Sequence, residues 1–268
     1  HAALSISEFS ANSSDEFPDS DGDSSDWIEL HNQGALAINT RGYSLTDDPD
    51  SNRKWPIPEI TISPGQYLLV FASGKDRAIS GQELHTNFSL SESGEYLALL
   101  GPDQDTPDTS FNYPKQFYAI SYGKPGYFNT PTPGRTNAPA TYSDYVRDTK
   151  FSSTRGLFSS AFLLEISSST PGATIYYTAD FTLPSPENGT LYTQALEINA
   201  TSVIRAIATH PGMVSSNVDT QTYIFPADVI TQPTTPQGFP QTWGIDNSTN
   251  NGNTGLPRPA DYEMDPEV

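Results

Sequence analysis

Turn-forming residues interrupt this chain about every ten residues, and this spacing limits it to short strands. The 268-residue sequence contains 23 prolines and 19 glycines, which break long helices. Between them lie short runs rich in β-branched and aromatic residues, such as ALSISEF, QYLLVFAS and SVIRAIA. Frequent short runs of this kind are typical of β-sandwiches and barrels. We therefore predict an all-β chain.

The runs fall into two groups that are separated by the proline-rich stretch FNTPTPGRTNAP at 128–139. After residue 228 the prolines and the run DNSTNNGNTG leave few apolar residues for a core. Any order there is expected to come from docking of Phe239, Trp243, Tyr262 or Met264 on another surface. We predict two tandem immunoglobulin-like sandwiches, at 1–137 and 138–228, and an irregular Pro/Asn-rich C-terminal arm at 229–268 that is a linker or docking arm.

The charge balance excludes several classes of partner. With 32 acidic and 13 basic residues the net charge is −19, so the surface would repel nucleic acid and anionic lipid. Cysteine is absent, which rules out disulfides and thiolate metal sites in this sequence. No apolar run approaches the roughly 18 residues that a membrane-spanning helix needs. We expect neither nucleic-acid binding nor membrane insertion.

Four aspartates crowd the stretch DSDGDSSD: Asp19, Asp21, Asp23 and Asp26. Calcium prefers several carboxylate and carbonyl oxygens on a flexible loop, and Gly22 allows a tight bend. The spacing is not that of an EF-hand, and the same residues also suit a solvated loop whose carboxylates bond local amides. Both interpretations stay open. We predict a Ca²⁺-responsive loop with a structural effect.

Residues that would support catalysis are not grouped in the sequence. The histidines, His1, His31, His85 and His210, show no metal-ligand spacing, and no GxSxG elbow is present. His85 is expected to order a loop, and the second acidic cluster, Asp47, Asp48 and Asp50, to form a turn. Trp27 and Trp55 are expected in the core. We expect no enzymatic activity.

The first segment resembles the bacterial extracellular form of the lamin-tail domain. The matching stretches are ISEFSANSS (6–14), DGDSSDWIELHN (21–32), GYSLTDDPD (42–50), LHTNFSLSESGEYLALL (84–100) and PTPGRTN (131–137). The resemblance implies an immunoglobulin-like sandwich with an interaction role, and it supplies no catalytic residues.

The second segment resembles the chitobiase/β-hexosaminidase C-terminal type of sandwich, which is Fn3/Ig-like. The matching stretches are TPGATIYYTAD (170–180), LYTQALEI (191–198), SVIRAIA (202–208) and VDTQTYIF (218–225). That pattern usually has Asp-Gly where this chain has Asp180-Phe181, so a different turn is expected there. The tail is similar to connectors that lead into a CotH-kinase-like domain in large secreted bacterial proteins.

Together the two resemblances imply a non-catalytic module of a larger secreted bacterial protein, extracellular or on the cell surface. Its role would be that of a spacer, an adhesion module or an assembly subunit. The alternative is a carbohydrate-binding accessory region of a secreted enzyme whose catalytic domain lies beyond this chain. The expected partners are a protein, a cell-surface glycan or a second copy of the chain.

Overall fold

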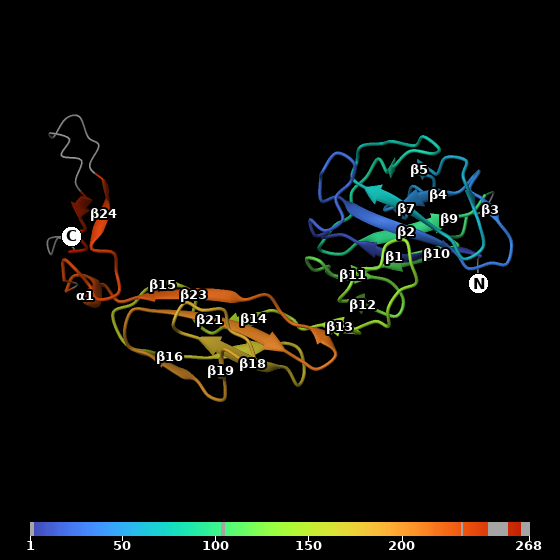
Figure 1. Cartoon of the computed structure of the whole chain (residues 1–268). Helices are drawn as coiled ribbons and strands as arrows, with labels where there is room; N and C mark the ends of the chain where they lie inside the picture. The colour runs from blue at the N-terminus through green and yellow to red at the C-terminus, as the bar shows by residue number, and fades with distance from the viewer. Residues whose placement is uncertain (1–2, 103–104, 232, 246–256, 264–268) are drawn as a thin grey trace. The chain divides into compact units, whose positions relative to one another are not determined.

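The computed structural model describes residues 3–102, 105–231, 233–245 and 257–263. The fold is nearly all β, as predicted, and its helix α1 (Pro226–Val229) is a single turn. In these ranges no helix has the length and apolarity to cross a membrane. The chain divides into two compact units, 1–144 with 212–214, and 145–211 with 215–268 (Figure 1). The expected boundary between residues 137 and 138 stays a prediction.

The first unit is a sandwich of a six-stranded sheet, in the order β12-β11-β1-β2-β7-β8, and a four-stranded sheet, in the order β10-β9-β4-β5. A short pair, β3 and β6, lies beside them. The strands are β1 (Leu4–Ser10), β2 (Asp26–Asn32), β3 (Ile38–Asn39), β4 (Ser44–Thr46), β5 (Trp55–Pro56), β6 (Thr61–Ile62), β7 (Tyr67–Ala72), β8 (Leu84–His85), β9 (Tyr96–Leu100), β10 (Thr109–Asn112), β11 (Ser121–Tyr122), β12 (Tyr127–Phe128) and β13 (Asp144–Tyr145).

The core of this unit lies between its two sheets. Alternate residues of β2, Ile28 and Leu30, are fully buried against Leu97 and Leu99 of β9, which belongs to the other sheet. Period-two alternation of this kind places every second side chain on one face of a strand. Each such aliphatic side chain contributes about 2 kcal/mol by leaving water. Trp55 lies in this core, as predicted, whereas Trp27 is buried outside this cluster.

A β-bulge in β1 changes the faces of the residues after it. Ile6 pairs with Leu30, but Glu8 pairs with Glu29, so Ser7 is the extra residue. Without the bulge, alternation would bring Glu8 into the core and turn Phe9 away from it. With it, Phe9 is buried in the core cluster, and Ser7 and Glu8 lie on the outer face of the six-stranded sheet.

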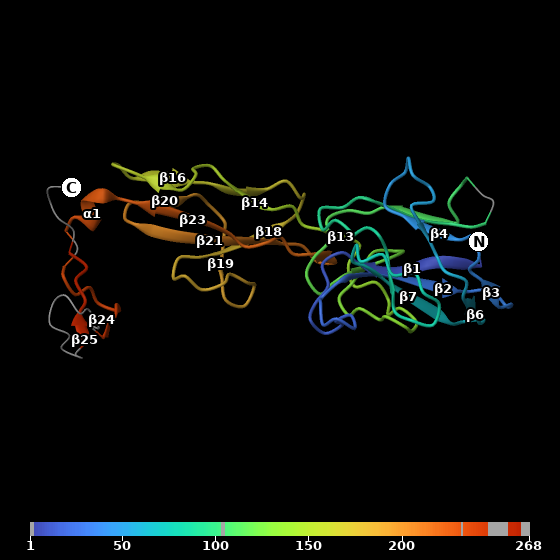
Figure 2. The ribbon, with the colours of Figure 1, turned by 90° about the horizontal axis from the view of Figure 1, so that it is seen from above.

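The second unit contains a five-stranded sheet, in the order β15-β23-β21-β18-β19, and the strand pairs β14–β17 and β16–β20 (Figure 2). In β21, Ile204, Ala206 and Ala208 are buried and the residues between them are half-buried, so one face of the strand lies on the core. The strands of this unit are β14 (Thr149–Phe151), β15 (Gly156–Leu157), β16 (Phe162–Leu164), β17 (Ile166–Ser168), β18 (Thr174–Thr178), β19 (Thr190–Leu191), β20 (Leu196–Ile198), β21 (Ser202–Thr209), β23 (Asp219–Ile224), β24 (Thr242–Ile245) and β25 (Pro257–Pro259). The strand β22 (Met213–Val214) belongs to the first unit and pairs with β13.

The described part of the C-terminal arm folds on itself. β24 and β25 form an antiparallel pair, and the rings of Phe239 and Trp243 each pack edge-on against Tyr262 at 5.3 Å. Order in the arm was predicted only from docking on another surface; instead, these three aromatic side chains pack against one another beside the strand pair. Met264 lies outside the described residues.

Candidate functional site

The acidic loop before β2 is a tight turn that gathers three carboxylates. Gly22 adopts the left-handed conformation (φ 88°), and its N–H donates to the Asp19 carbonyl at 2.9 Å. The Asp19 carboxylate accepts hydrogen bonds from the backbone N–H groups of Asp21 and Asp23 at 3.0 and 3.1 Å. One carboxylate oxygen from each of these three aspartates therefore lies within 4.8 Å of the others.

Lys75 neutralises this cluster from the loop that joins β7 to β8. Its ammonium nitrogen lies 2.6 Å from Asp19, 2.7 Å from Asp21 and 2.9 Å from Asp23, and Arg77 contacts Asp21 at 2.7 Å. Burial alone would raise the pKa of Asp19, but the hydrogen bonds from Lys75 and Ser25 and from the loop amides hold it well below its usual range. The same carboxylates raise the pKa of Lys75.

Asp26 is not part of the cluster, which corrects the expectation of four converging aspartates. It is the first residue of β2, so the sheet and not the loop sets its position. Its carboxylate accepts the N–H of Leu90 at 3.2 Å. Burial, with the nearby charges of Glu95 and Glu92, raises the pKa of Asp26 to about 7.

The three remaining aspartates fit an internal ion-pair cluster better than an open metal site. A calcium ion needs oxygen ligands on all sides, and the Lys75 ammonium already lies within hydrogen-bond distance of each carboxylate. Calcium binding at Asp19, Asp21 and Asp23 stays a prediction, with the condition that the ion displaces Lys75.

The second acidic cluster and His85 have the structural roles that the sequence predicts. Asp48 lies in a turn, where its carboxylate accepts the N–H of Asp50 at 2.9 Å and Asp47 pairs with Lys54 at 2.6 Å. His85 is fully buried and links the Ser73 hydroxyl at 2.8 Å to the Glu83 carboxylate at 2.9 Å, which orders the loop that carries Lys75.

Two buried glutamates that were not predicted from the sequence, Glu8 and Glu29, are partners in register on β1 and β2. Both are fully buried. Glu8 accepts hydrogen bonds from the Ser121 hydroxyl, from the N–H of Thr132 at 3.0 Å and from its hydroxyl at 2.6 Å. The signal in the sequence is a glutamate in the middle of an otherwise buried strand, WIEL.

Glu29 binds the chain two residues after Thr132, at Gly134. Its carboxylate accepts from the Ser7 hydroxyl at 2.5 Å and from the N–H of Gly134 at 2.6 Å. Burial, partly offset by these hydrogen bonds, raises the pKa of Glu29 to about 7. The two glutamates thus anchor residues 131–137, which we call the closing segment, on the outer face of the sheet.

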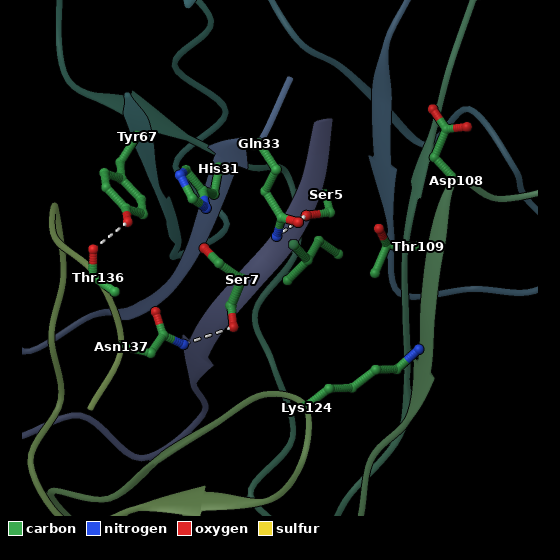
Figure 3. A pocket seen from close by; sticks show the side chains of 11 residues that line it. Ser5, Ser7, His31, Gln33, Tyr67, Asp108, Thr109, Lys124, Thr136 and Asn137 are labelled. Atoms are coloured by element: carbon green, nitrogen blue, oxygen red, sulfur yellow. Dashed lines mark hydrogen bonds between the residues drawn. The ribbon is translucent and has the colours of Figure 1, made fainter. Parts of the chain in front are cut away.

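A groove of about 440 Å³ opens beside the closing segment (Figure 3). The ring of His31 stacks on Tyr67 with centroids 4.1 Å apart, and Lys124 and Asp108 lie on the side away from Tyr67. Its lining residues come from β1, β2, β7, β10, the residues that adjoin β2 and β10, the loop between β11 and β12, and the closing segment. They are Ser5, Ile6, Ser7, His31, Gln33, Tyr67, Asp108, Thr109, Lys124, Thr136 and Asn137.

Hydrogen bonds fix the polar groups of the groove. Asn137 donates to the Ser7 carbonyl at 3.0 Å, Tyr67 to the Thr136 hydroxyl at 3.2 Å, and Gln33 to the Ser5 hydroxyl at 3.2 Å. The Ser7 hydroxyl donates its hydrogen bond to the Glu29 carboxylate and not to His31, the imidazole that lines the groove. The Ser5 hydroxyl is bonded to Gln33 and also not to His31. The arrangement therefore suits recognition of a bound surface.

Replacing Lys75 tests the internal ion pairs. Lys75→Met leaves three close carboxylates without their central cation, so we expect a lower melting temperature in EDTA and a clear rise in millimolar CaCl₂, larger than in wild type. Thermal melting measures both. Asp21→Ala/Asp23→Ala in the Lys75→Met background should remove the rise. An equal calcium response in wild type and Lys75→Met would place the ion elsewhere.

The raised pKa values of Glu29 and Asp26 predict an acid-stabilised fold. The folded state keeps these protons while the unfolded state releases them, so their contribution is complete below the unfolded pKa and is lost as pH rises to about 7. Glu29 alone contributes up to about 1.4 kcal/mol per pH unit in that window. His31, whose pKa burial lowers, acts in the opposite direction.

Melting wild type and Glu29→Gln across this pH range isolates the effect. The stability of wild type relative to the variant should fall steadily between the ordinary glutamate pKa near 4.5 and the raised pKa of about 7. A constant difference would show that Glu29 does not titrate in the folded protein.

Comparison with known proteins agrees with this architecture. Residues 1–114 match the family model of the Lamin Tail Domain, and residues 154–220 match that of the Chitobiase/beta-hexosaminidase C-terminal domain. A search of curated proteins finds no match. The chain thus carries a lamin tail domain followed by a chitobiase/β-hexosaminidase C-terminal domain.

Proposed function

We propose that this chain is a non-catalytic interaction module of a larger extracellular or cell-surface protein, with the groove beside the closing segment as its contact surface. The observation that carries the proposal is the groove's preorganisation. Its wall is anchored by Glu8 and Glu29, and its side chains are held by hydrogen bonds before any partner arrives. Preorganisation lowers the entropic cost of binding.

The two domain types support the same conclusion, because both are immunoglobulin-like accessory domains. An extracellular location is in keeping with the second domain, whose family occurs in secreted carbohydrate-active proteins. The acidic surface, with a net charge of −19, favours solubility and disfavours contact with nucleic acid. The first candidate role is assembly, through self-association or a protein partner.

The second candidate is a carbohydrate-binding accessory region of a secreted enzyme. The groove favours it because a stacked ring pair lies beside the amides of Gln33 and Asn137 and the hydroxyl of Thr136. Such a mixture of a ring surface and fixed polar groups is typical of small-molecule sites.

Sedimentation velocity over the micromolar range, with a glycan array in parallel, tests both candidates. We expect concentration-dependent self-association that His31→Ala/Gln33→Ala weakens and Gln82→Ala, an exposed control on another loop, leaves unchanged. Glycan binding that the groove variant abolishes would favour the second candidate. A chain that stays monomeric, and whose glycan binding is absent or unaffected by the groove variant, would contradict both self-association and glycan binding through the groove.

A further inference from the structure

In the second unit, the loop between β18 and β19 displays an aromatic side chain on a strained backbone. Phe181 has φ 68°, in the left-handed region that bulky residues avoid. Its side chain is 71% exposed, so core packing does not account for the residue. The sequence pattern that this segment resembles has glycine at this position, where the conformation carries no strain.

Hydrogen bonds on both sides hold the strained residue in place. The Asp180 carboxylate accepts from the N–H of Thr182 at 3.1 Å and from its hydroxyl at 2.6 Å. The guanidinium of Arg205 donates to the Phe181 carbonyl at 2.8 Å. A strained conformation that its surroundings enforce is a recognised mark of a functional position.

A hollow of about 540 Å³ adjoins this turn, and Asp180, the residue before Phe181, is one of the residues that line it. The other residues that line it include Tyr177, Glu187 and Asn188. The loop is preformed, because Asn188 donates to the Thr182 hydroxyl and to the Leu183 carbonyl, both at 3.0 Å. A Cβ on Gly189 would lie 2.8 Å from the Ser185 carbonyl oxygen, so the loop closes tightly on itself.

The chemistry of the hollow selects a class of ligand. Carboxylates are acceptors only, and the Asn188 amide keeps its carbonyl oxygen for a ligand because its NH₂ is already bonded. The described residues that line the hollow include no lysine or arginine, so an anion would find no counter-charge. The fitting ligand donates hydroxyl hydrogens and offers an apolar C–H face to a ring.

We propose that the Phe181 turn and the adjoining hollow form a binding site for a neutral oligosaccharide, separate from the groove of the first unit. A basic peptide fits less well. A surface with a net charge of −19 attracts cations everywhere, so binding a basic peptide would not require an aromatic residue on a strained backbone at this turn.

Isothermal titration of the full chain with soluble neutral oligosaccharides of glucose, N-acetylglucosamine, mannose and xylose tests the site. Phe181→Asn removes the ring but tolerates the left-handed backbone. We expect it to weaken binding by roughly tenfold or more while the melting temperature stays the same or rises. Phe181→Tyr keeps the ring and should bind as wild type does. Leu163→Asn, at another exposed apolar position, should also bind normally.

Three outcomes would overturn the proposal. They are no binding of any of these sugars, equal binding by Phe181→Asn and wild type, or loss of binding in the groove variant His31→Ala/Gln33→Ala instead. Binding of an oligolysine peptide that added salt abolishes, with no sugar binding, would identify the site as a cation site and reject the proposal. Self-association through the groove is measured in a separate experiment, so the oligosaccharide site and the proposed role of the groove can be rejected independently.

Discussion

Two glutamates buried side by side on neighbouring strands constrain the whole first unit. Carboxylates out of water are costly unless hydrogen bonds replace the lost solvation. Glu8 and Glu29 obtain three of those bonds from the closing segment, more than a hundred residues away in sequence, and the others from the hydroxyls of Ser121 and Ser7. The closing segment must therefore lie across the outer face of the sheet, and the groove exists because the segment covers only part of that face.

The carboxylates of the acidic loop before β2 are also compensated, but by ion pairs. Its carboxylates are neutralised by Lys75 and Arg77, which come from the loop after β7. A chain with a net charge of −19 thus uses two of its few basic residues to hold one loop against the sheet. The acidic groups that suggest chemistry in the sequence carry structure, and the groove beside the closing segment is lined mostly by uncharged side chains.

Local sequence was enough to predict the strands and much of the architecture. The run YLLVFA coincides with β7 (Tyr67–Ala72). A short apolar run between turn signals is too short for a helix and is typical of a buried strand. Convergence of Asp19, Asp21 and Asp23 was also predictable from their spacing around Gly22. The partner Lys75 was not, because its approach depends on the pairing of β2 with β7. Glu8 was missed because a bulge, which alternation does not reveal, turns it outward.

Amide hydrogen exchange of Thr132 and Gly134 tests the central claim most directly. Both N–H groups donate to buried carboxylates, so they should exchange as slowly as the amides of β2, although they lie in a proline-rich segment outside any strand. Exchange as fast as that of an exposed loop would show that the closing segment is not anchored, and the account of the groove would fail with it.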